Sequence, residues 1–553
     1  MVNVYSGEIY PANVAVSEGR IAYVGPAERP AAEVVDAAGL YLSPGWIEPH
    51  GHPWMLYNPV SQIEAILPGG TTLLFNDDLL FHLQAGPEGV RRALDALADL
   101  PLTYRWLIRL LSQSELSDET EVFAPESVLP LLDRPDVAGT AELTRWPQVL
   151  RGNASVLAGI SRALALGKRA DGHTAGASYE KLNAIGAGGI SACHEAITAG
   201  EIADRLRLGF WTILRHSSLR PDLPELARAI TEMRLDTRRL MLTMDGPSPR
   251  FVAENGFLDY ALRELVARGV APVTAIQMAT INPATYYGMD QERGGIAPGR
   301  IADFVLLPDL ETFRSARVVV AGRDVARDGR LLAHLPNVDW DALDLRPSFA
   351  PFPEGWNRPG GSLPVIELIT NVITRGAGAA PWTSDGGVPD GMLLAVLLDR
   401  QGRWMTRAWL RGFAPRLSAL ASTYNSSGHL LVLGSDLRAM EHAAAAVVKC
   451  HGGIAFAEAE GVSWQFALPI AGMMSPLPFA ETVRAQREIE TRVQAAGFVY
   501  ADICYALLFL AADFLPGWRL TPRGVLDVRS GALVEEAVQG RSTIGSGEKA
   551  IHG

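Results

Sequence analysis

Hydrophobic and polar positions alternate in two different ways along the first half of the chain. In residues 1–43 they alternate with a period of two between glycine-containing turns, which predicts a small antiparallel sheet. In residues 44–289, short apolar runs alternate with segments whose apolar residues recur every three or four positions, as Leu258, Leu262 and Leu265 do. This repeated strand–helix alternation predicts an α/β fold with a parallel (β/α)8 barrel.

The pattern changes again beyond the predicted barrel. Residues 290–345 return to short strands, and we expect them to join residues 1–43 in one discontinuous β-sandwich domain. Residues 346–361 are rich in Pro and Gly, which is typical of a linker. Residues 362–540 mix strands with helices and are expected to form an α/β or α+β domain of their own. Residues 541–553 are expected to be disordered.

Within the predicted barrel, five apolar runs end on side chains that bind metals. The carboxyl ends of parallel barrel strands meet at one mouth, so the side chains that follow them lie close together. Nitrogen and oxygen ligands in this number suit two neighbouring divalent cations. The candidate metal ligands are His50, His52, Glu142, His173, His194 and Asp245.

The spacing suggests how several of these residues act. His50 and His52 lie two residues apart at one strand end, so their imidazoles point to the same side. Glu142 closes the run VAGTAE and is the candidate carboxylate that bridges both cations. Structural roles stay open as alternatives: core packing for the histidines, an exposed loop position for Glu142, and turn formation for Asp245 before Gly-Pro.

These ligands indicate a hydrolytic chemistry. A bound divalent cation lowers the pKa of water from about 15.7 to about 7, so that a metal-bridging hydroxide can act as the nucleophile at neutral pH. Asp245 is the candidate proton shuttle, which takes the proton of the nucleophile and delivers it to the leaving group. Glu195 directly follows His194 and is expected to orient a ligand. Hydrolysis of a C–N bond fits this arrangement best.

Composition limits the partners and the cellular compartment that we expect for this protein. The 553 residues are 48% hydrophobic, and the net charge of −12 argues against nucleic acid as a partner, because phosphate binding needs clustered Lys and Arg. Cys193, Cys450 and Cys504 are too few and too widely spaced for a disulfide framework or a zinc motif. No signal-peptide pattern is visible and the apolar stretch near residue 510 is too short to span a bilayer, so we expect a cytoplasmic protein without a membrane partner.

Longer blocks of the sequence resemble a known family. PGWIEPHGH, AELTRWPQV and GHTAGASYEKLNAIGAGGISACHE are similar to blocks of the bacterial adenine deaminases, within the amidohydrolase superfamily. ALPIAGMMS and LLFLAADFLPGWRLTPRGVLDV resemble the C-terminal domain of the same family, so the resemblance covers nearly the whole chain. It implies hydrolysis of adenine to hypoxanthine and ammonia by a homodimer. It also implies two divalent cations per subunit, with Mn or Fe favoured over Zn, on the six candidate ligands.

The chain departs from this family around the substrate. Pro53-Trp54 stands where the family has Glu-Ser, Arg215-His216-Ser217-Ser218 where it has Arg-Glu-Gly-Ser, and Gly246 where it has a second aspartate. Trp54 is a candidate for stacking on a flat heterocycle, with packing as its alternative. His216 is a catalytic candidate that would polarise a ring nitrogen, with a structural role as its alternative. The candidate substrate-binding residues are Trp54, Gln113, Arg215, Ser217 and His429.

Three hypotheses for function follow from these patterns. The leading one is a deaminase of adenine or of a modified adenine. The alternative is a hydrolase of the same barrel that cleaves an amide or cyclic amide of another small heterocycle, because one fold hosts many reactions. A catalytically silent scaffold is the third, and the presence of all six candidate ligands argues against it. The first two share a small-molecule partner, which is purine-like in the first.

Overall fold

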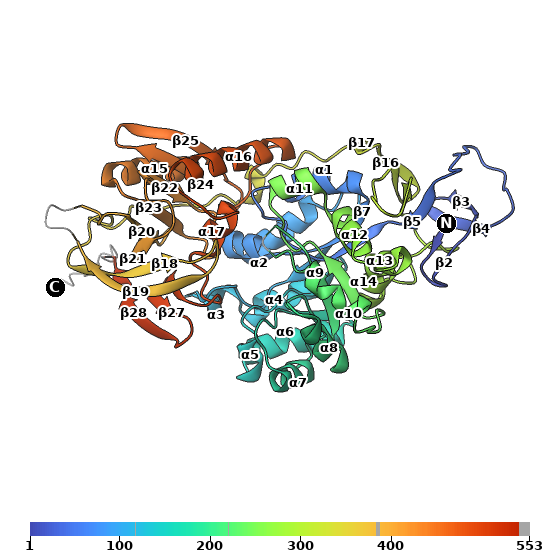
Figure 1. Ribbon diagram of the computed structural model, residues 1–553, viewed down its shortest axis with the longest axis horizontal. Helices are drawn as coiled ribbons and strands as arrows, with labels where there is room; N and C mark the ends of the chain where they lie inside the picture. Colours follow the sequence, from blue (N-terminus) through green and yellow to red (C-terminus); the bar gives the residue numbers. More distant parts are fainter. Residues whose placement is uncertain (117, 219, 383–386, 541–553) are drawn as a thin grey trace, which may run out of the picture. The chain divides into compact units, whose positions relative to one another are not determined.

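The computed structural model describes residues 1–116, 118–218, 220–382 and 387–540, and it divides into two compact units (Figure 1). Unit 1 contains Met1–Ser112, Asp118–Leu345 and Pro476–Arg484, and unit 2 contains the other described residues. The predicted disordered segment 541–553 lies outside the described residues.

Eight strands form the centre of unit 1, and each lies parallel to the next in chain order. This arrangement confirms the predicted (β/α)8 barrel. The strands are β6 (Trp46–Gly51), β7 (Thr71–Asp77), β8 (Thr103–Ile108), β9 (Val137–Thr140), β10 (Arg169–Gly172), β11 (Ala192–Cys193), β12 (Trp211–Arg215) and β13 (Leu240–Thr243).

Helices follow the barrel strands along the chain, and the longer ones bury an apolar face. In α12 the residues Leu258, Leu262 and Leu265 are all fully buried, as their spacing predicts. The helices of this region are α1 (Pro59–Ile66), α2 (Leu79–Ala96), α3 (Glu119–Val122), α4 (Pro125–Leu132), α5 (Pro147–Leu150), α6 (Ala154–Ala165), α7 (Tyr179–Ala187), α8 (Ala199–Arg207), α9 (Leu223–Leu226), α10 (Arg228–Thr231), α11 (Pro249–Asn255), α12 (Leu258–Ala267), α13 (Pro272–Met278) and α14 (Ile281–Tyr286).

Side chains help to join the last barrel strand to the first. The Thr243 hydroxyl donates a hydrogen bond of 2.7 Å to the His50 carbonyl. The buried Glu48 carboxylate accepts the Met244 N–H at 2.9 Å and the His50 N–H at 3.1 Å. These bonds fix the end of β13 against the end of β6, where three of the candidate metal ligands lie.

Short antiparallel sheets from both ends of unit 1 accompany the barrel. Strand β5 (Tyr41–Pro44), just before the barrel, pairs with β14 (Phe304–Leu307), which lies beyond it in the sequence. The sheet continues through β15 (Arg317–Val320), β16 (Arg323–Arg327) and β17 (Arg330–Leu331). Two further hairpins are formed by β1 (Val2–Asn3) with β2 (Glu8–Ile9) and by β3 (Asn13–Ser17) with β4 (Arg20–Gly25).

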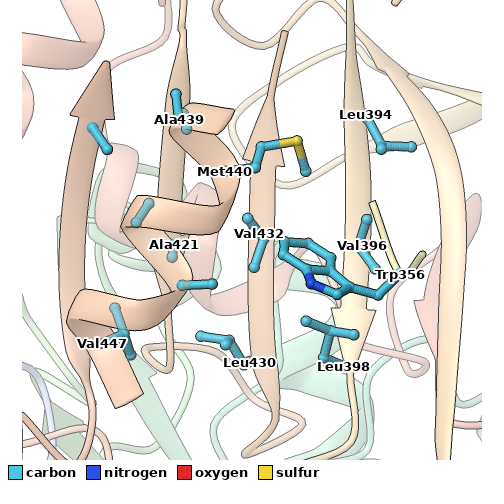
Figure 2. Packing of buried hydrophobic residues seen from close by; sticks show 14 of the residues in the cluster. Trp356, Leu394, Val396, Leu398, Ala421, Leu430, Val432, Ala439, Met440 and Val447 are labelled. Atoms are coloured by element: carbon cyan, nitrogen blue, oxygen red, sulfur yellow. The ribbon is translucent and has the colours of Figure 1, made fainter. Parts of the chain in front are cut away.

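Unit 2 is built on a mixed sheet with the strand order β19-β18-β21-β20-β23-β22-β24-β25. Helix α15 (Leu437–Lys449) packs on this sheet, and Figure 2 shows Met440 and Val447 of the helix close to Val432 and Leu430 of β23. Trp356, from the predicted linker, also lies in this core with 9% of its surface exposed. The strands are β18 (Ser362–Leu368), β19 (Thr374–Pro381), β20 (Met392–Leu398), β21 (Trp404–Arg411), β22 (Ala419–Ser422), β23 (Leu430–Gly434), β24 (Gly453–Glu458) and β25 (Gly461–Ala467).

The C-terminal part of the described chain adds two helices and a small second sheet. The helices are α16 (Phe479–Ala495) and α17 (Ile503–Phe509). The small sheet consists of β26 (Trp518–Thr521), β27 (Gly524–Asp527) and β28 (Ala532–Glu536), and β29 (Val538–Gln539) pairs with β21. Within the described ranges, none of the helices has both the length and the apolar content that a bilayer crossing requires.

Candidate metal centre

The carboxyl end of β6 presents two histidines to the barrel interior. Glu48 and His50 alternate along this strand, and His52 follows two residues later, just beyond its end. His50 is 2% exposed and His52 is 6% exposed, although imidazoles are polar. Their rings lie 5.1 Å apart at 86° to each other, so the two side chains approach a common point from different directions.

Glu142, two residues beyond β9, lies among all four candidate histidines. Its Oε2 atom is 2.7 Å from His173 Nδ1, 3.3 Å from His194 Nε2 and 3.9 Å from His50 Nε2. Its Oε1 atom is 3.7 Å from His52 Nε2. Oε2 therefore faces three of the histidines and Oε1 faces the fourth, so the two oxygens are near different ligands, as a carboxylate that bridges two cations requires.

Asp245 completes the cluster through an unusual backbone conformation. It follows β13 at φ 60°, in the left-handed region that Asp and Asn tolerate better than most residues. The Asp245 N–H donates to the Thr243 hydroxyl at 2.7 Å, and a β-bridge to Gly51 ties the residue to β6. Its Oδ1 atom lies 3.0 Å from His52 Nε2 and 3.9 Å from His50 Nε2. The turn thus directs the carboxylate back to the β6 histidines.

The cluster has the chemistry of a divalent-cation site. The His50 Nε2 atom is buried and has no hydrogen-bond partner among the described residues, yet it faces the carboxylates of Glu142 and Asp245. The described ranges contain three groups of three metal-binding side chains whose ligand atoms lie within 4.8 Å of one another. All three groups lie in this cluster. Imidazole nitrogen and carboxylate oxygen together suit Mn, Fe and Zn. The residues present therefore fit bound divalent metal.

Two further carboxylates orient His50 and His52 by contacting their Nδ1 atoms. Asp171, at the end of β10, lies 2.7 Å from His50 Nδ1, and Asp77, at the end of β7, lies 3.1 Å from His52 Nδ1. A carboxylate on Nδ1 fixes the tautomer that leaves Nε2 available to a metal and increases its basicity. Asp171 and Asp77 are missing from the candidate residues of the sequence, because their partners lie on other strands.

Replacing Asp171 by Asn is expected to weaken metal binding about 10-fold or more, because His50 loses the charge that orients its ring. Competition of Mn²⁺ binding against a fluorescent chelator measures the change. Asp204→Asn, at a partly exposed position of α8, is the matched control. An unchanged Mn²⁺ affinity in the Asp171 variant would show that Asp171 does not support the site.

Burial and neighbouring charges lower the pKa of some residues in the cluster and raise the pKa of others. Burial and the neighbouring His50 lower the pKa of His194 to about 4. Burial acts to lower the pKa of His52 as well, but Asp77 and Asp245 raise it to about 10. Burial alone would raise the pKa of Glu142, whereas Arg109 and His173 hold it well below its usual range. Because imidazole must be neutral to bind a metal, loading the site has to displace the His52 proton.

Comparison with known proteins identifies the family. A model described as the amidohydrolase family matches residues 41–325, and one described as the adenine deaminase C-terminal domain matches residues 371–532. An adenine deaminase of Rubrobacter xylanophilus is 37% identical over 96% of this chain and 92% of its own length. One of Moorella thermoacetica is 33% identical over 97% and 94%, and a putative adenine deaminase of Oceanobacillus iheyensis is 31% identical over 96% and 92%. The chain belongs to the adenine deaminase family of amidohydrolases. It is thus a hydrolytic enzyme that acts on C–N bonds, as the sequence predicts.

Among the other predicted residues of this family member, Glu195 and Arg215 reach the metal ligands. Glu195 Oε1 lies 3.5 Å from His194 Nε2 and contacts Arg215 Nη1. Arg215 also donates to Asp245 Oδ2 at 3.0 Å. Burial would raise the pKa of Glu195, but Arg215 and the histidines lower it below the usual range. Arg215 therefore connects the proposed proton shuttle with a second buried acid.

The remaining predicted pocket residues have other contacts. The Trp54 indole N–H donates to Asp77 at 2.9 Å, and the ring packs 4.8 Å from that of His52 with 4% of the residue exposed. The His216 ring packs 5.3 Å from Tyr260 of α12. The Ser217 N–H donates to the Arg220 carbonyl at 3.1 Å. Substrate contacts of these side chains stay predictions.

Two predicted substrate residues belong to unit 2. Gln113 is grouped with that unit and is 5% exposed. His429 packs its ring 4.6 Å from that of Trp404, with Nδ1 3.4 Å from Asp399 Oδ1. Burial and the nearby Arg400 lower the pKa of His429 to about 3. The contacts of His429 therefore place it in the interior of its own unit, and its part in substrate binding stays a prediction.

Proposed function

We propose that this protein hydrolyses the C6–N bond of adenine, or of a modified adenine, and that adenine yields hypoxanthine and ammonia. The observation that supports this most strongly is the cluster of four imidazoles around Glu142, closed by Asp245 at the mouth of the barrel. The names of the relatives, which match over nearly their whole length, supply the substrate.

The proposed centre holds two divalent cations per subunit, with Mn or Fe favoured over Zn. Glu142 would be the carboxylate shared by both cations. His50, His52 and Asp245 would hold one cation, and His173 and His194 would hold the other. Cations in such a site lower the pKa of a bound water to about 7 and make it nucleophilic at neutral pH. From the family relation we also propose that the protein is cytoplasmic and forms a homodimer. Light scattering after gel filtration measures its molar mass and tests the homodimer.

Asp245 is proposed to move the protons of the reaction. Water adds to C6 of the purine, and the Asp245 carboxylate takes the proton that the water loses. The C6–N bond then breaks, and Asp245 returns the proton to the leaving nitrogen, so that ammonia departs and the carboxylate is restored. Arg215 supports this cycle because its hydrogen bond to Oδ2 holds the carboxylate in place and favours its ionised form.

Glu195 is proposed to position Arg215 rather than to touch the substrate. Its carboxylate contacts the same guanidinium nitrogen, Nη1, that bonds Asp245. It also lies 3.8 Å from His173 Nδ1, so it links the two sides of the centre. The His216 ring packs on Tyr260 of α12. Its catalytic role, which is to polarise a ring nitrogen of the substrate, stays a separate prediction.

A substrate panel tests the function. Protein loaded with Mn²⁺ is expected to release ammonia from adenine, or the corresponding amine from an N6-modified adenine, with the matching change in ultraviolet absorbance. The panel also contains cyclic amides, because Pro53-Trp54 and Gly246 depart from the family near the metal ligands. Turnover of a cyclic amide with no turnover of any aminopurine would favour the alternative reaction. No turnover in the whole panel by fully metal-loaded protein would contradict both.

A further inference from the structure

Trp54 lies just beyond β6 and hydrogen-bonds through its indole nitrogen to a buried carboxylate. The indole N–H donates to Asp77 Oδ1 at 2.9 Å, and the ring lies 4.8 Å from the His52 ring at 42°. Only 4% of Trp54 is exposed, so little of its surface is left for a second flat ring. Pro53-Trp54 is among the departures of this chain from its family, and the family relation therefore supplies no role for this side chain.

The two oxygens of Asp77 have different donors. Oδ2 accepts a hydrogen bond from Arg109 Nε at 2.8 Å and also contacts Arg109 Nη2. The same oxygen lies 3.1 Å from His52 Nδ1, which donates because an ionised carboxylate can only accept. In the described part of the chain, the Trp54 indole is the one hydrogen-bond donor to Oδ1. Three donors thus meet on one oxygen, and Trp54 sets the rotation of the carboxylate about its Cβ–Cγ bond.

The guanidinium that shares Asp77 with His52 is itself held in place. Arg109 follows β8 and is fully buried. Its Nη2 atom donates to Glu142 Oε1 at 2.7 Å, and Nη1 donates to the Glu142 main-chain carbonyl at 3.0 Å. Guanidinium groups pair best with both oxygens of a carboxylate. Without the bond from Trp54, Asp77 would gain such a pair by rotating toward Nε and Nη2 of Arg109, and Oδ2 would move away from His52.

We propose that Trp54 is a positioning residue for the metal centre: its indole N–H holds Asp77 so that Oδ2 stays on the Nδ1 atom of His52. The inference rests on the proposed metal centre. A carboxylate on Nδ1 fixes the imidazole tautomer that leaves Nε2 available to a cation. Trp54 therefore supports cation binding through two other side chains. This role needs no contact with the substrate, unlike the stacking role predicted from the sequence.

Mn²⁺ binding in the absence of substrate tests the proposal. Chelator-treated full-length protein is titrated with Mn²⁺ in competition with a fluorescent chelator. The analogue β-(3-benzothienyl)alanine in place of Trp54 keeps the shape and the aromatic face of the indole but has sulfur where the indole has N–H. It is expected to weaken Mn²⁺ binding about 10-fold, which is typical of a lost contact behind a metal ligand. Trp54→Phe is expected to act in the same direction, and circular dichroism checks that it folds.

Two comparisons separate positioning from packing. Trp409→Phe removes a buried indole of unit 2, whose N–H donates to the Ala380 carbonyl at 2.9 Å, and is expected to leave the Mn²⁺ affinity unchanged. In an Asp77→Asn background, Trp54→Phe is expected to weaken Mn²⁺ binding by less than about 2-fold more, because both changes act on the same contact. The visible absorption of bound Co²⁺ depends on the arrangement of its ligands, so it is expected to change in Trp54→Phe and not in Trp409→Phe.

The outcomes separate this inference from the stacking role and from the proposed function. An unchanged Mn²⁺ affinity with the analogue at position 54 overturns the inference. So does an equal loss of affinity in Trp409→Phe, because the effect would then be general destabilisation. If Trp54→Leu raises KM at saturating Mn²⁺ while its Mn²⁺ affinity is unaltered, Trp54 contacts the substrate instead. Failure of the unaltered protein to bind any Mn²⁺ contradicts the metal centre itself and with it the proposed function.

Discussion

Replacing Glu142 by Gln is expected to abolish metal binding and deamination together. The Glu142 carboxylate contacts ligands on both sides of the centre, with Oε2 near His173 and Oε1 near His52. Glutamine has the same shape but lacks the negative charge that two adjacent cations need. Losing the metal contribution of several kcal/mol lowers kcat/KM by roughly 10³-fold or more. Metal content by mass spectrometry and the rate of ammonia release measure both effects.

The control for this variant is Glu180→Gln in the first turn of α7, where the side chain is exposed. It is expected to keep full metal content and rate. Circular dichroism checks that the Glu142 variant keeps its fold. If that variant retained two cations per subunit and most of its rate, Glu142 would not be the bridging ligand.

Replacing Asp245 by Asn is expected to lower kcat by roughly 10²- to 10⁴-fold, which is the contribution typical of a general acid–base residue. Asparagine tolerates the left-handed backbone at φ 60°, so the turn after β13 is kept. Its amide oxygen still faces the β6 histidines, but the side chain can no longer accept and return a proton. Single-turnover rates at saturating Mn²⁺ and adenine separate this loss from weaker metal binding.

The exposed pair of Asp236 with Arg238 provides the control, because Asp236→Asn removes an exposed carboxylate that is not a predicted ligand and is expected to leave kcat unchanged. A kcat for the Asp245 variant within a factor of about two of the unaltered protein would place the proton transfer on another group. Rescue of the rate by added Mn²⁺ alone would show that Asp245 acts only as a metal ligand.

The barrel could be predicted from the sequence because its signals are local. Each strand is a short apolar run, and each helix shows its buried face in its own spacing, as α12 does with Leu258 and Leu262. Even β11, which has only Ala192 and Cys193 in strand conformation, is marked by the run GGISACH. Trp356 shows the opposite case: a segment rich in Pro and Gly looks like a linker, whereas the burial of its indole depends on strands that lie further along the chain.

The six candidate ligands could be proposed from the sequence for a related reason. Strand ends of a parallel barrel converge, so a polar residue that ends a buried strand, such as His194, is placed without knowledge of its partners. Arg109 and Asp77 also end strands, but their meaning depends on which carboxylate meets which guanidinium across the mouth. That pairing depends on the stagger of neighbouring strands and on how far each side chain extends. Neither can be read from the residues next to it in the sequence. Trp54 illustrates the same limit, because its hydrogen bond to Asp77 spans two strands.

The most direct test is a crystal structure of the protein grown with Mn²⁺, with anomalous scattering recorded at the manganese edge. Two peaks per subunit are expected on opposite sides of the Glu142 carboxylate, one within bonding distance of His50, His52 and Asp245 and the other within bonding distance of His173 and His194. An active protein whose manganese peaks lie elsewhere, or that shows none at this mouth, would contradict the central claim that these six side chains form the catalytic metal site.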